Sequence, residues 1–272
     1  MELIFKNMSF SYASVPVLEH VCLDLSQAQF ISIIGPNGVG KSTLIHCVNK
    51  ILSPTLGSVL LDGKSIKNYH QKEVAQHVGY VPYTSSDTFP LTVVDTVLLG
   101  RHPHAGWKTS DEDLEIVYET LKQLEIEDLA MRHFNELSAG QHQKVMLARG
   151  LVQRPEILLL DEPTSNLDIK HQLGISKLLR KLSREKNIMV IMISHDLNIA
   201  AKYSDNVIMM HKGGIYAVGT PAEVLTRENI MHVYGVDCDI VDDHGVPHLI
   251  MHDGEDTCEP VPEGAVCMIT SP

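Results

Sequence analysis

Long apolar runs are missing from this sequence. The longest, such as Ile157 to Leu160 and Ile188 to Ile193, fall far short of the roughly 20 residues that a membrane-spanning helix needs. We also expect no leader, because residues 1–5 alternate as a strand does instead of joining a basic segment to an apolar one. We therefore expect a soluble protein that stays in the cytosol.

Basic charge and paired cysteines are also scarce. The 22 lysines and arginines are outnumbered by 34 aspartates and glutamates, which leaves a formal net charge of −12. Because phosphate backbones bind clustered Lys and Arg, this balance argues against a nucleic-acid partner. The cysteines are odd in number and lack close pairs, which favours reduced thiols. They are Cys22, Cys47, Cys238, Cys258 and Cys267.

What the sequence does contain is a glycine-rich loop that matches G-x-x-x-x-G-K-S in full. The loop follows a strand-like run, Phe30 to Ile34, and leads into the apolar start of a helix. Its glycines let several N–H groups point into one concavity, where the helix dipole adds positive charge. The loop therefore predicts a site for a nucleotide polyphosphate. It consists of Gly35, Pro36, Asn37, Gly38, Val39, Gly40, Lys41, Ser42 and Thr43.

Four side chains have predicted chemical roles. Lys41 would reach the outer phosphates as a point charge, and the Ser42 hydroxyl would complete the coordination of a hydrated Mg²⁺ ion. Asp161 and Glu162 follow the apolar run 157–160, at the end of a strand where a parallel sheet places ligands. We expect Asp161 to hold the metal through its water shell and Glu162 to polarise the attacking water. An ordinary strand-end turn is the alternative for this pair.

The order of predicted elements indicates an α/β fold with a parallel sheet. Ile175, Leu178, Leu179 and Leu182 mark a crossover helix between two of the buried strands. Strands are expected at 2–5, 8–10, 17–25, 30–34, 57–63, 78–82, 157–160 and 189–193, and a hairpin at 207–218.

Residues from about 90 to 152 change to helical periodicity and predict a wholly helical insert. Leu114, Val117, Leu121 and Leu124 follow one helix face. Ser138 occupies the cap position of a second helix in the insert, whose N-terminus is free to bind an anion. A plain helix cap explains this serine equally well.

The compact body is expected to end near Gly235, which leaves residues 236–272 as a tail. His244, His248 and His252 are evenly spaced there among acidic residues, so a metal-sensing role is conceivable. Gly245 and Pro247 oppose a helix that would align these histidines, and no C-x-x-C pair is present. The pattern favours a solvated acidic tail.

Taken together, five segments resemble the nucleotide-binding domain of ABC transporters in their order along residues 1 to about 235. They are similar to the Walker A, signature, Walker B, D-loop and switch-histidine segments of that family. The resemblance implies an ATPase with a P-loop NTPase core, in which a RecA-like parallel sheet is joined by an antiparallel β subdomain and by a helical subdomain at about 85–152. The segments are residues 35–43, 137–141, 157–162, 165–168 and His195.

The resemblance also implies how ATP is held. Tyr12 would stack on adenine, and His195 would contact the γ-phosphate beside Glu162. In a head-to-tail homodimer, Ser138 and Gly140 of one subunit would close over the ATP bound by residues 35–43 of the other. Asp168, in the D-loop, would also belong to the nucleotide site.

Residues 89–104 look like the insert of ATPases that serve importers of iron siderophores, haem or cobalamin, and in some members molybdate or tungstate. This resemblance implies a peripheral subunit on the cytoplasmic face of the membrane, working with a separate permease and a substrate-binding protein. Import of an oxyanion, or a non-transport role as a soluble ABC ATPase, are the alternatives. The acidic chain lacks the basic extensions usual in the latter class.

Two positions depart from the family pattern. Tyr83, counted among the nucleotide-binding positions, replaces a glutamine whose carbonyl oxygen binds magnesium and senses the permease. A neutral phenol is a poor magnesium ligand, so water is expected in place of that oxygen. Ala139 replaces a glycine of the signature, a small change that leaves Ser138 and Gly140 usable.

Overall fold

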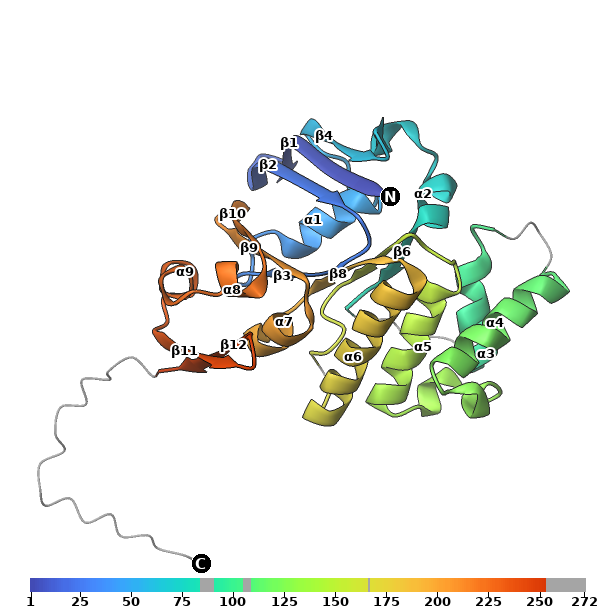
Figure 1. The fold of residues 1–272 in the computed structure, drawn as a ribbon. Helices are drawn as coiled ribbons and strands as arrows, with labels where there is room; N and C mark the ends of the chain where they lie inside the picture. The colour runs from blue at the N-terminus through green and yellow to red at the C-terminus, as the bar shows by residue number, and fades with distance from the viewer. Residues whose placement is uncertain (84–90, 105–108, 166, 253–272) are drawn as a thin grey trace, which may run out of the picture.

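The computed structural model describes residues 1–83, 91–104, 109–165 and 167–252 (Figure 1). These residues form a six-stranded sheet, a four-stranded sheet and a two-stranded hairpin, with helices on both sides of the largest sheet. The predicted α/β architecture is confirmed. Among these residues, no helix combines the length and the apolar character needed to cross a membrane.

The central sheet has the order β10-β9-β3-β8-β7-β6, in which all neighbouring strands are parallel except the β9–β10 pair. Every residue of β3, β7 and β8 is buried, which the continuous apolar runs of β7 and β8 predict. The carboxyl ends of these three adjacent strands lie at one edge of the sheet, which brings the residues after each of them together. The strands are β3 (Phe30–Ile34), β6 (Val78–Val81), β7 (Ile157–Leu160), β8 (Met189–Ile193), β9 (Asn206–His211) and β10 (Gly214–Gly219).

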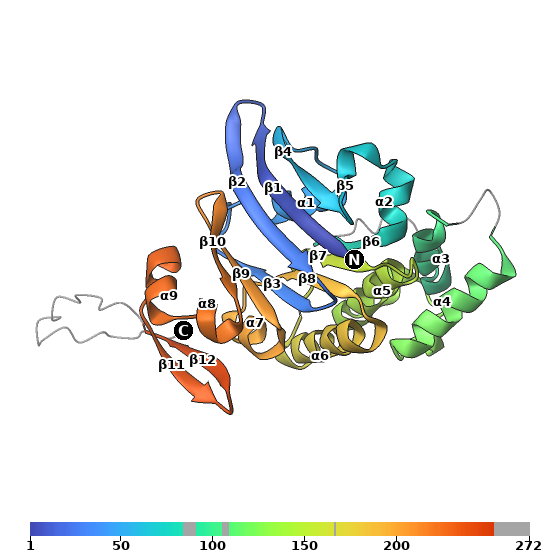
Figure 2. The same cartoon turned by 45° about the horizontal axis from the view of Figure 1, so that its top comes forward.

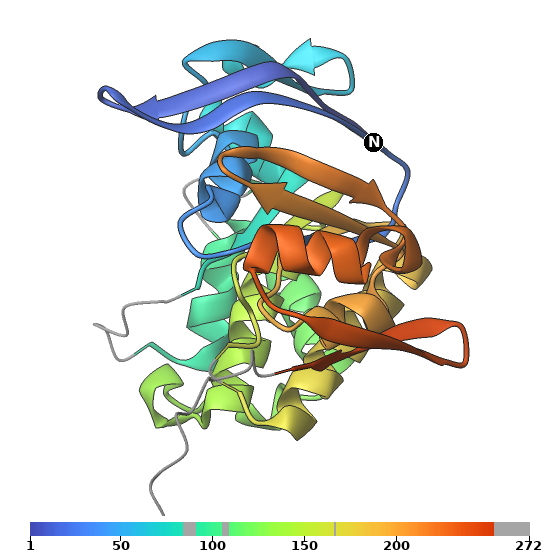
Figure 3. The same cartoon turned by 90° about the vertical axis from the view of Figure 1, so that its left-hand side faces the viewer.

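An antiparallel sheet of order β2-β1-β4-β5 covers one face of the central sheet, with helix α1 (Lys41–Val48) packed between them (Figures 1 and 3). The two short strands predicted at 2–5 and 8–10 are one strand, because shifts in its pairing with β2 absorb the break in alternation. Its strands are β1 (Glu2–Tyr12), β2 (Val15–Ser26), β4 (Leu56–Leu61) and β5 (Lys64–Ser65).

Helices cover the opposite face of the central sheet. Alternate strand residues separate the two cores: Ile31 and Leu159 point to α1, while Phe30 and Leu158 point to the helical insert. Leu114 differs from the predicted helix face, since it is exposed and Ile116 is buried in its place. The helices on this side are α3 (Val93–Leu98), η2 (Leu99–Arg101), α4 (Asp111–Gln123), η3 (Glu127–Leu129), η4 (Phe134–Glu136), α5 (Ala139–Leu151) and α6 (Ile169–Lys186). Two further elements, η1 (Ile66–Asn68) and α2 (Gln71–His77), pack into the core around α1 instead.

The packed body continues beyond Gly235, where the sequence pattern predicts its end. A hairpin of β11 (Cys238–Asp243) and β12 (Val246–Met251) lies beside α7 (Leu197–Tyr203), and follows α8 (Pro221–Val224) and α9 (Arg227–Tyr234) (Figure 2). Cys238 and Leu249 are buried, so residues 236–252 are not a solvated tail. Cys258, Cys267 and the acidic residues after His252 lie outside the described residues.

Candidate active site

The glycine-rich loop joins β3 to α1 at the carboxyl edge of the central sheet. Gly35 has φ 146° and Gly40 has φ 98°, values that residues with a side chain rarely adopt. A Cβ atom on Gly35 would lie 2.5 Å from the Met210 carbonyl oxygen, and one on Gly40 would lie 2.7 Å from Leu18. The loop therefore keeps its tight shape because glycine alone fits at these two points.

Lys41 is the first residue of α1 and folds back over the loop. Its Nζ atom donates hydrogen bonds to the carbonyl oxygens of Gly35 and Pro36, both at 2.8 Å. Burial lowers the pKa of Lys41, while Glu162 and Asp161 act in the opposite direction. The ammonium group is thus held above the concavity, where a phosphate oxygen can replace a carbonyl as its partner.

Ser42 and Asp161 meet although they are far apart in the sequence. The Ser42 hydroxyl donates to Oδ1 of Asp161 at 3.1 Å, and Asp161 follows directly after β7. Burial raises the pKa of Asp161, so its charged form is disfavoured until a cation compensates it. A hydroxyl beside a buried carboxylate is the hard oxygen donor set that suits Mg²⁺.

Two residues near Asp161 are not predicted by the sequence. His46 Nε2 lies 2.9 Å from the Tyr80 hydroxyl, and both groups interact electrostatically with Asp161. Burial raises the pKa of Tyr80 to about 12 and lowers the pKa of His46. No sequence signal marks this pair, because His46 lies within a helix and Tyr80 within a strand.

Glu162 and His195 form a close pair at the same edge. His195 Nε2 lies 2.6 Å from Glu162 Oε1, and both side chains remain partly exposed. Glu162 has φ 49°, a left-handed conformation in the turn after β7, whereas His195 follows β8. The predicted base and the predicted switch histidine are therefore direct neighbours.

The two candidate tyrosines belong to different sheets: Tyr12 ends a strand of the antiparallel sheet, and Tyr83 follows β6 of the central sheet. Tyr12 ends β1 with half of its surface exposed, and its ring packs edge-on against Phe10 at a centroid distance of 4.8 Å. Tyr83 lines a cavity of about 270 Å³ together with Glu162, Leu137 and Ala139. This cavity connects the loop after β6 with the start of α5.

Ser138 caps α5 in the described chain. Its N–H donates to Gln141 Oε1 at 3.1 Å, and its hydroxyl accepts from the Gln141 N–H at 3.4 Å, which is a capping box. Gly140 is buried, and a Cβ atom there would lie 2.5 Å from the ring of His171. None of these contacts involves the phosphate loop.

His171 connects the signature segment to the D-loop, a role that the sequence does not reveal. Its N–H and its Nδ1 atom lie 2.9 and 2.8 Å from Asp168 Oδ1. The backbone contact makes Asp168 the N-cap of α6 and lowers the pKa of its carboxyl group, and the His171 side chain lowers it further. Asn166 of the D-loop and residues 89–90 of the insert lie outside the described residues.

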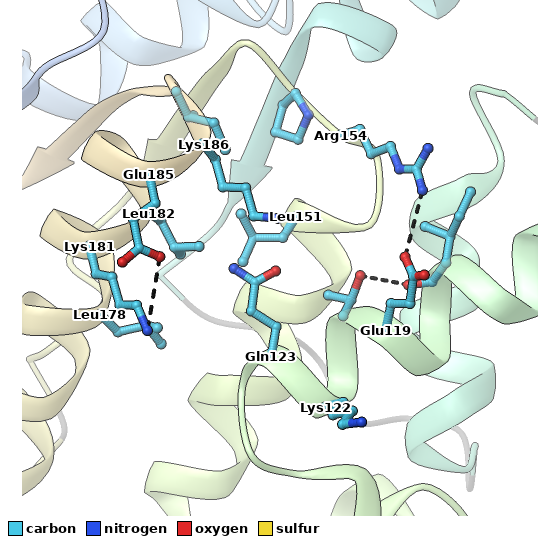
Figure 4. A pocket seen from close by; sticks show the side chains of 14 residues that line it. Glu119, Lys122, Gln123, Leu151, Arg154, Leu178, Lys181, Leu182, Glu185 and Lys186 are labelled. Carbon is cyan, nitrogen blue, oxygen red and sulfur yellow. Dashed lines mark hydrogen bonds and ion pairs between the residues drawn. The ribbon is translucent and has the colours of Figure 1, made fainter.

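A roomier cavity of about 730 Å³ lies between α4, the end of α5 and α6 (Figure 4). Ile116, Leu151 and Leu182 line it among charged side chains, and Glu119 points toward Arg154 across a distance of 3.8 Å. None of its lining residues belongs to the phosphate loop or to the turn after β7. The chemistry predicted from the sequence is therefore located elsewhere.

Comparison with known proteins agrees with this geometry. Residues 18–165 match the family described as ABC transporter. An uncharacterised ABC transporter ATP-binding protein of Methanocaldococcus jannaschii is 48% identical over 92% of this chain and 98% of its own length. The ferric enterobactin transport ATP-binding protein of Escherichia coli is 38% identical over 88% of this chain and 89% of its own length.

A solved structure extends the likeness to the fold. An inward-facing ABC transporter of the metal-chelate type superposes with a TM-score of 0.81 at 27% identity, over 92% of this chain and 97% of the other. The family match and the two relatives each cover more than half of the chain. The chain therefore belongs to the ABC transporter family, as an ATP-binding subunit that hydrolyses ATP.

Proposed function

We propose that the chain binds MgATP at residues 35–43 and uses its hydrolysis to energise the import of a metal chelate through a separate membrane permease. The relative named for ferric enterobactin transport and the metal-chelate-type structure support this cargo class. The observation that carries the site is the Ser42–Asp161 contact, which lies at the same sheet edge as the Glu162–His195 pair.

Binding of the nucleotide starts from the loop backbone. The N–H groups at the start of α1 and the positive end of its dipole face the polyphosphate, and Lys41 exchanges its carbonyl partners for phosphate oxygens. Tyr12, exposed at the end of β1, offers a ring face on which adenine can stack. These residues together orient the γ-phosphate toward the turn after β7.

Ser42 and Asp161 would hold Mg²⁺, with Asp161 acting through the metal's water shell. A metal held there would supply positive charge to offset the negative charge that develops on the phosphate oxygens. Burial raises the pKa of Asp161 because it disfavours the charged carboxylate, and a neighbouring cation would stabilise that charged form. Tyr83 lies at the cavity beside Glu162, where a phenol can orient water without binding the metal.

Glu162 is the proposed general base. One of its oxygens, Oε1, contacts His195, which leaves the other oxygen to accept a proton from the attacking water. His195 fixes the orientation of this carboxylate and presents a donor to the γ-phosphate. Both residues follow strands that end at the sheet edge where the phosphate loop begins.

We also propose a head-to-tail homodimer at the cytoplasmic face of the membrane, which completes each ATP site. In one chain Ser138 and Gly140 contact residues of α5 and α6, and they would close over the nucleotide of the partner subunit. The α5 N-terminus then supplies a second helix dipole to the phosphates. A substrate-binding protein would deliver the chelate to the permease.

Uptake by the assembled transporter tests the cargo class. The chain, its permease and its binding protein are reconstituted in proteoliposomes and supplied with ferric siderophore, cobalamin or molybdate. We expect ATP-dependent accumulation of a chelate, and loss of accumulation in an Asp161→Asn complex. Uptake of molybdate alone would overturn the chelate assignment while leaving the ATPase assignment intact.

A further inference from the structure

One face of α1 carries two half-buried polar side chains, Ser42 and His46. They are four residues apart, so they are neighbours on the surface of the helix. The other six residues of α1, which the structure describes in full, are buried. The Ser42 hydroxyl contacts Asp161 at 3.1 Å, so this half-buried face is the part of α1 that is turned toward the candidate metal site.

His46 is bonded to the strand β6. Its Nε2 atom lies 2.9 Å from the Tyr80 hydroxyl, and in either tautomer of the imidazole one of these two groups donates to the other. The two rings pack edge-on, with their centroids 5.6 Å apart. Tyr80 also packs against the apolar cluster that contains Leu44 and Ile45 of α1. The phenol therefore fastens β6 to the helix that follows the phosphate loop.

The same strand holds the backbone of Asp161. Val81, the residue after Tyr80, accepts a hydrogen bond from the Asp161 N–H at 3.0 Å. This bond continues the parallel pairing of β6 with β7, in which Val81 is the partner of Leu160. The backbone of Asp161 is thus fixed to β6, while its side chain is bonded to α1.

Three hydrogen bonds therefore close a circuit beside the candidate metal site. They join Ser42 to Asp161, Asp161 to Val81, and Tyr80 to His46. Loss of the Tyr80–His46 bond opens the circuit, and α1 is then held at this edge of the sheet by one hydrogen bond fewer. The distance between Ser42 and Asp161 becomes less closely fixed as a result.

We propose that Tyr80, through its hydrogen bond to His46, is a positioning residue that sets the affinity of the Ser42–Asp161 site for Mg²⁺. This inference rests on the proposed function, in which those two residues hold the metal. A pair of ligands that is already in place loses less conformational freedom when the ion binds. A bond that merely satisfied two half-buried polar groups would stabilise the fold without favouring the metal.

The test compares Tyr80→Phe with Tyr69→Phe in the full-length chain. Both changes keep the ring and remove one hydroxyl. Tyr69 donates to the carbonyl oxygen of Leu61 at 3.2 Å, at the end of β4 in the antiparallel sheet, which contains neither predicted metal ligand. The probe is Mn²⁺, which takes the same oxygen ligands as Mg²⁺. Its Kd for the ADP-bound chain is measured by electron paramagnetic resonance, and the Kd of ADP is measured separately in EDTA, together with the Tm.

We expect Tyr80→Phe to raise the Kd of Mn²⁺ by about three- to ten-fold, the effect of one hydrogen bond. The Kd of ADP in EDTA and kcat at saturating Mg²⁺ should both stay within about two-fold of wild type, because Tyr80 acts on the metal ligands alone. Tyr69→Phe should keep the wild-type Kd of Mn²⁺ even if its Tm falls as much. An unchanged Kd of Mn²⁺ in Tyr80→Phe, or an equal rise in the Kd of ADP without metal, overturns the positioning role.

A second background tests whether the hydrogen bond itself is responsible. In a His46→Ala chain, Tyr80→Phe should raise the Kd of Mn²⁺ no further, because the partner of the hydroxyl is already gone. The same rise in both backgrounds would overturn the role of the Tyr80–His46 bond.

Ser42→Ala separates this inference from the proposed function. If Ser42→Ala weakens Mn²⁺ binding while Tyr80→Phe does not, the metal site stands and the role of Tyr80 falls. If Ser42→Ala binds Mn²⁺ as tightly as wild type, the assignment of the metal site falls, and the role of Tyr80 falls with it.

Discussion

His195 Nε2 lies 2.6 Å from Glu162 Oε1, although the two residues follow different strands. The contact exists because β7 and β8 are adjacent and parallel, so that their carboxyl ends open at one edge. The loop after β3, the next strand in the sheet, begins at the same edge. A base, its histidine neighbour and a phosphate-binding loop are thereby placed together by strand order alone.

The Arg101–Asp113 pair joins η2 to α4 and predicts that the free energy of unfolding falls at acidic pH. Arg101 Nε donates to Asp113 Oδ1 at 2.8 Å, and both side chains are almost fully buried. Hydrogen bonds from Arg101 and then Ser110 lower the pKa of Asp113 to about 2. Because the folded-state pKa is depressed, this carboxylate stabilises the fold above the unfolded-state pKa, and the stabilisation is lost as pH falls through the folded value.

We therefore expect Asp113→Asn to destabilise the chain by about 3 kcal/mol near pH 7, since it leaves a buried guanidinium unpaired. The difference from wild type should shrink between about pH 4 and pH 2. Urea unfolding at a series of pH values measures both. A difference that stays constant down to pH 2 would show that the pair does not titrate as described.

The close approach of Gly140 to His171 predicts that a substitution at Gly140 disturbs the start of α6. In Gly140→Ala the new methyl group meets the His171 ring, which must leave Asp168 at a cost of about 1 kcal/mol. Gly174→Ala, within α6 and with no atom near its Cβ position, is the matched control and should be neutral or stabilising. Urea unfolding measures each.

The same substitution in a His171→Ala background completes the cycle. Gly140→Ala should cost little there, because the ring that it displaces is gone. An equal cost in both backgrounds would mean that His171 is not the group that the methyl displaces.

The C-terminal hairpin predicts a sharp contrast between neighbouring residues. Leu249 is buried against α7, whereas Ile250 is about half exposed on the other face of β12. Leu249→Ala should lower the free energy of unfolding by about 2 to 4 kcal/mol, and Ile250→Ala by less than about 1 kcal/mol. Urea unfolding measures both changes. If both variants lose less than about 1 kcal/mol of unfolding free energy, residues 236–252 are a solvated tail after all.

Local sequence signals predict the glycine-rich loop and the buried strand between which the candidate site lies. The glycines around Lys41 define a loop by their own backbone preferences, and the uninterrupted apolar run before Asp161 identifies a buried parallel strand. The roles of single side chains in ATP binding stay predictions, because they depend on a nucleotide and a second subunit.

Contacts between distant residues could not be predicted in the same way. His171 carries no motif, and its position next to Gly140 follows from where α6 packs. The hairpin could not be predicted for a similar reason: Cys238 is the one buried residue of β11, and Asp237 and Asp239 on either side of it make the segment resemble a polar tail. In each case tertiary packing, and not a local sequence pattern, determines which residues come into contact.

The most direct measurement is steady-state ATPase activity of Glu162→Gln together with its affinity for ATP. Glu156→Gln is the matched control, since Glu156 also pairs with a histidine, His77, at 2.8 Å. We expect Glu162→Gln to keep ATP binding, to lose about 10²- to 10⁴-fold in turnover and to accumulate as an ATP-bound dimer, while Glu156→Gln behaves as wild type. Turnover of Glu162→Gln close to that of wild type would contradict the assignment of Glu162 as the base.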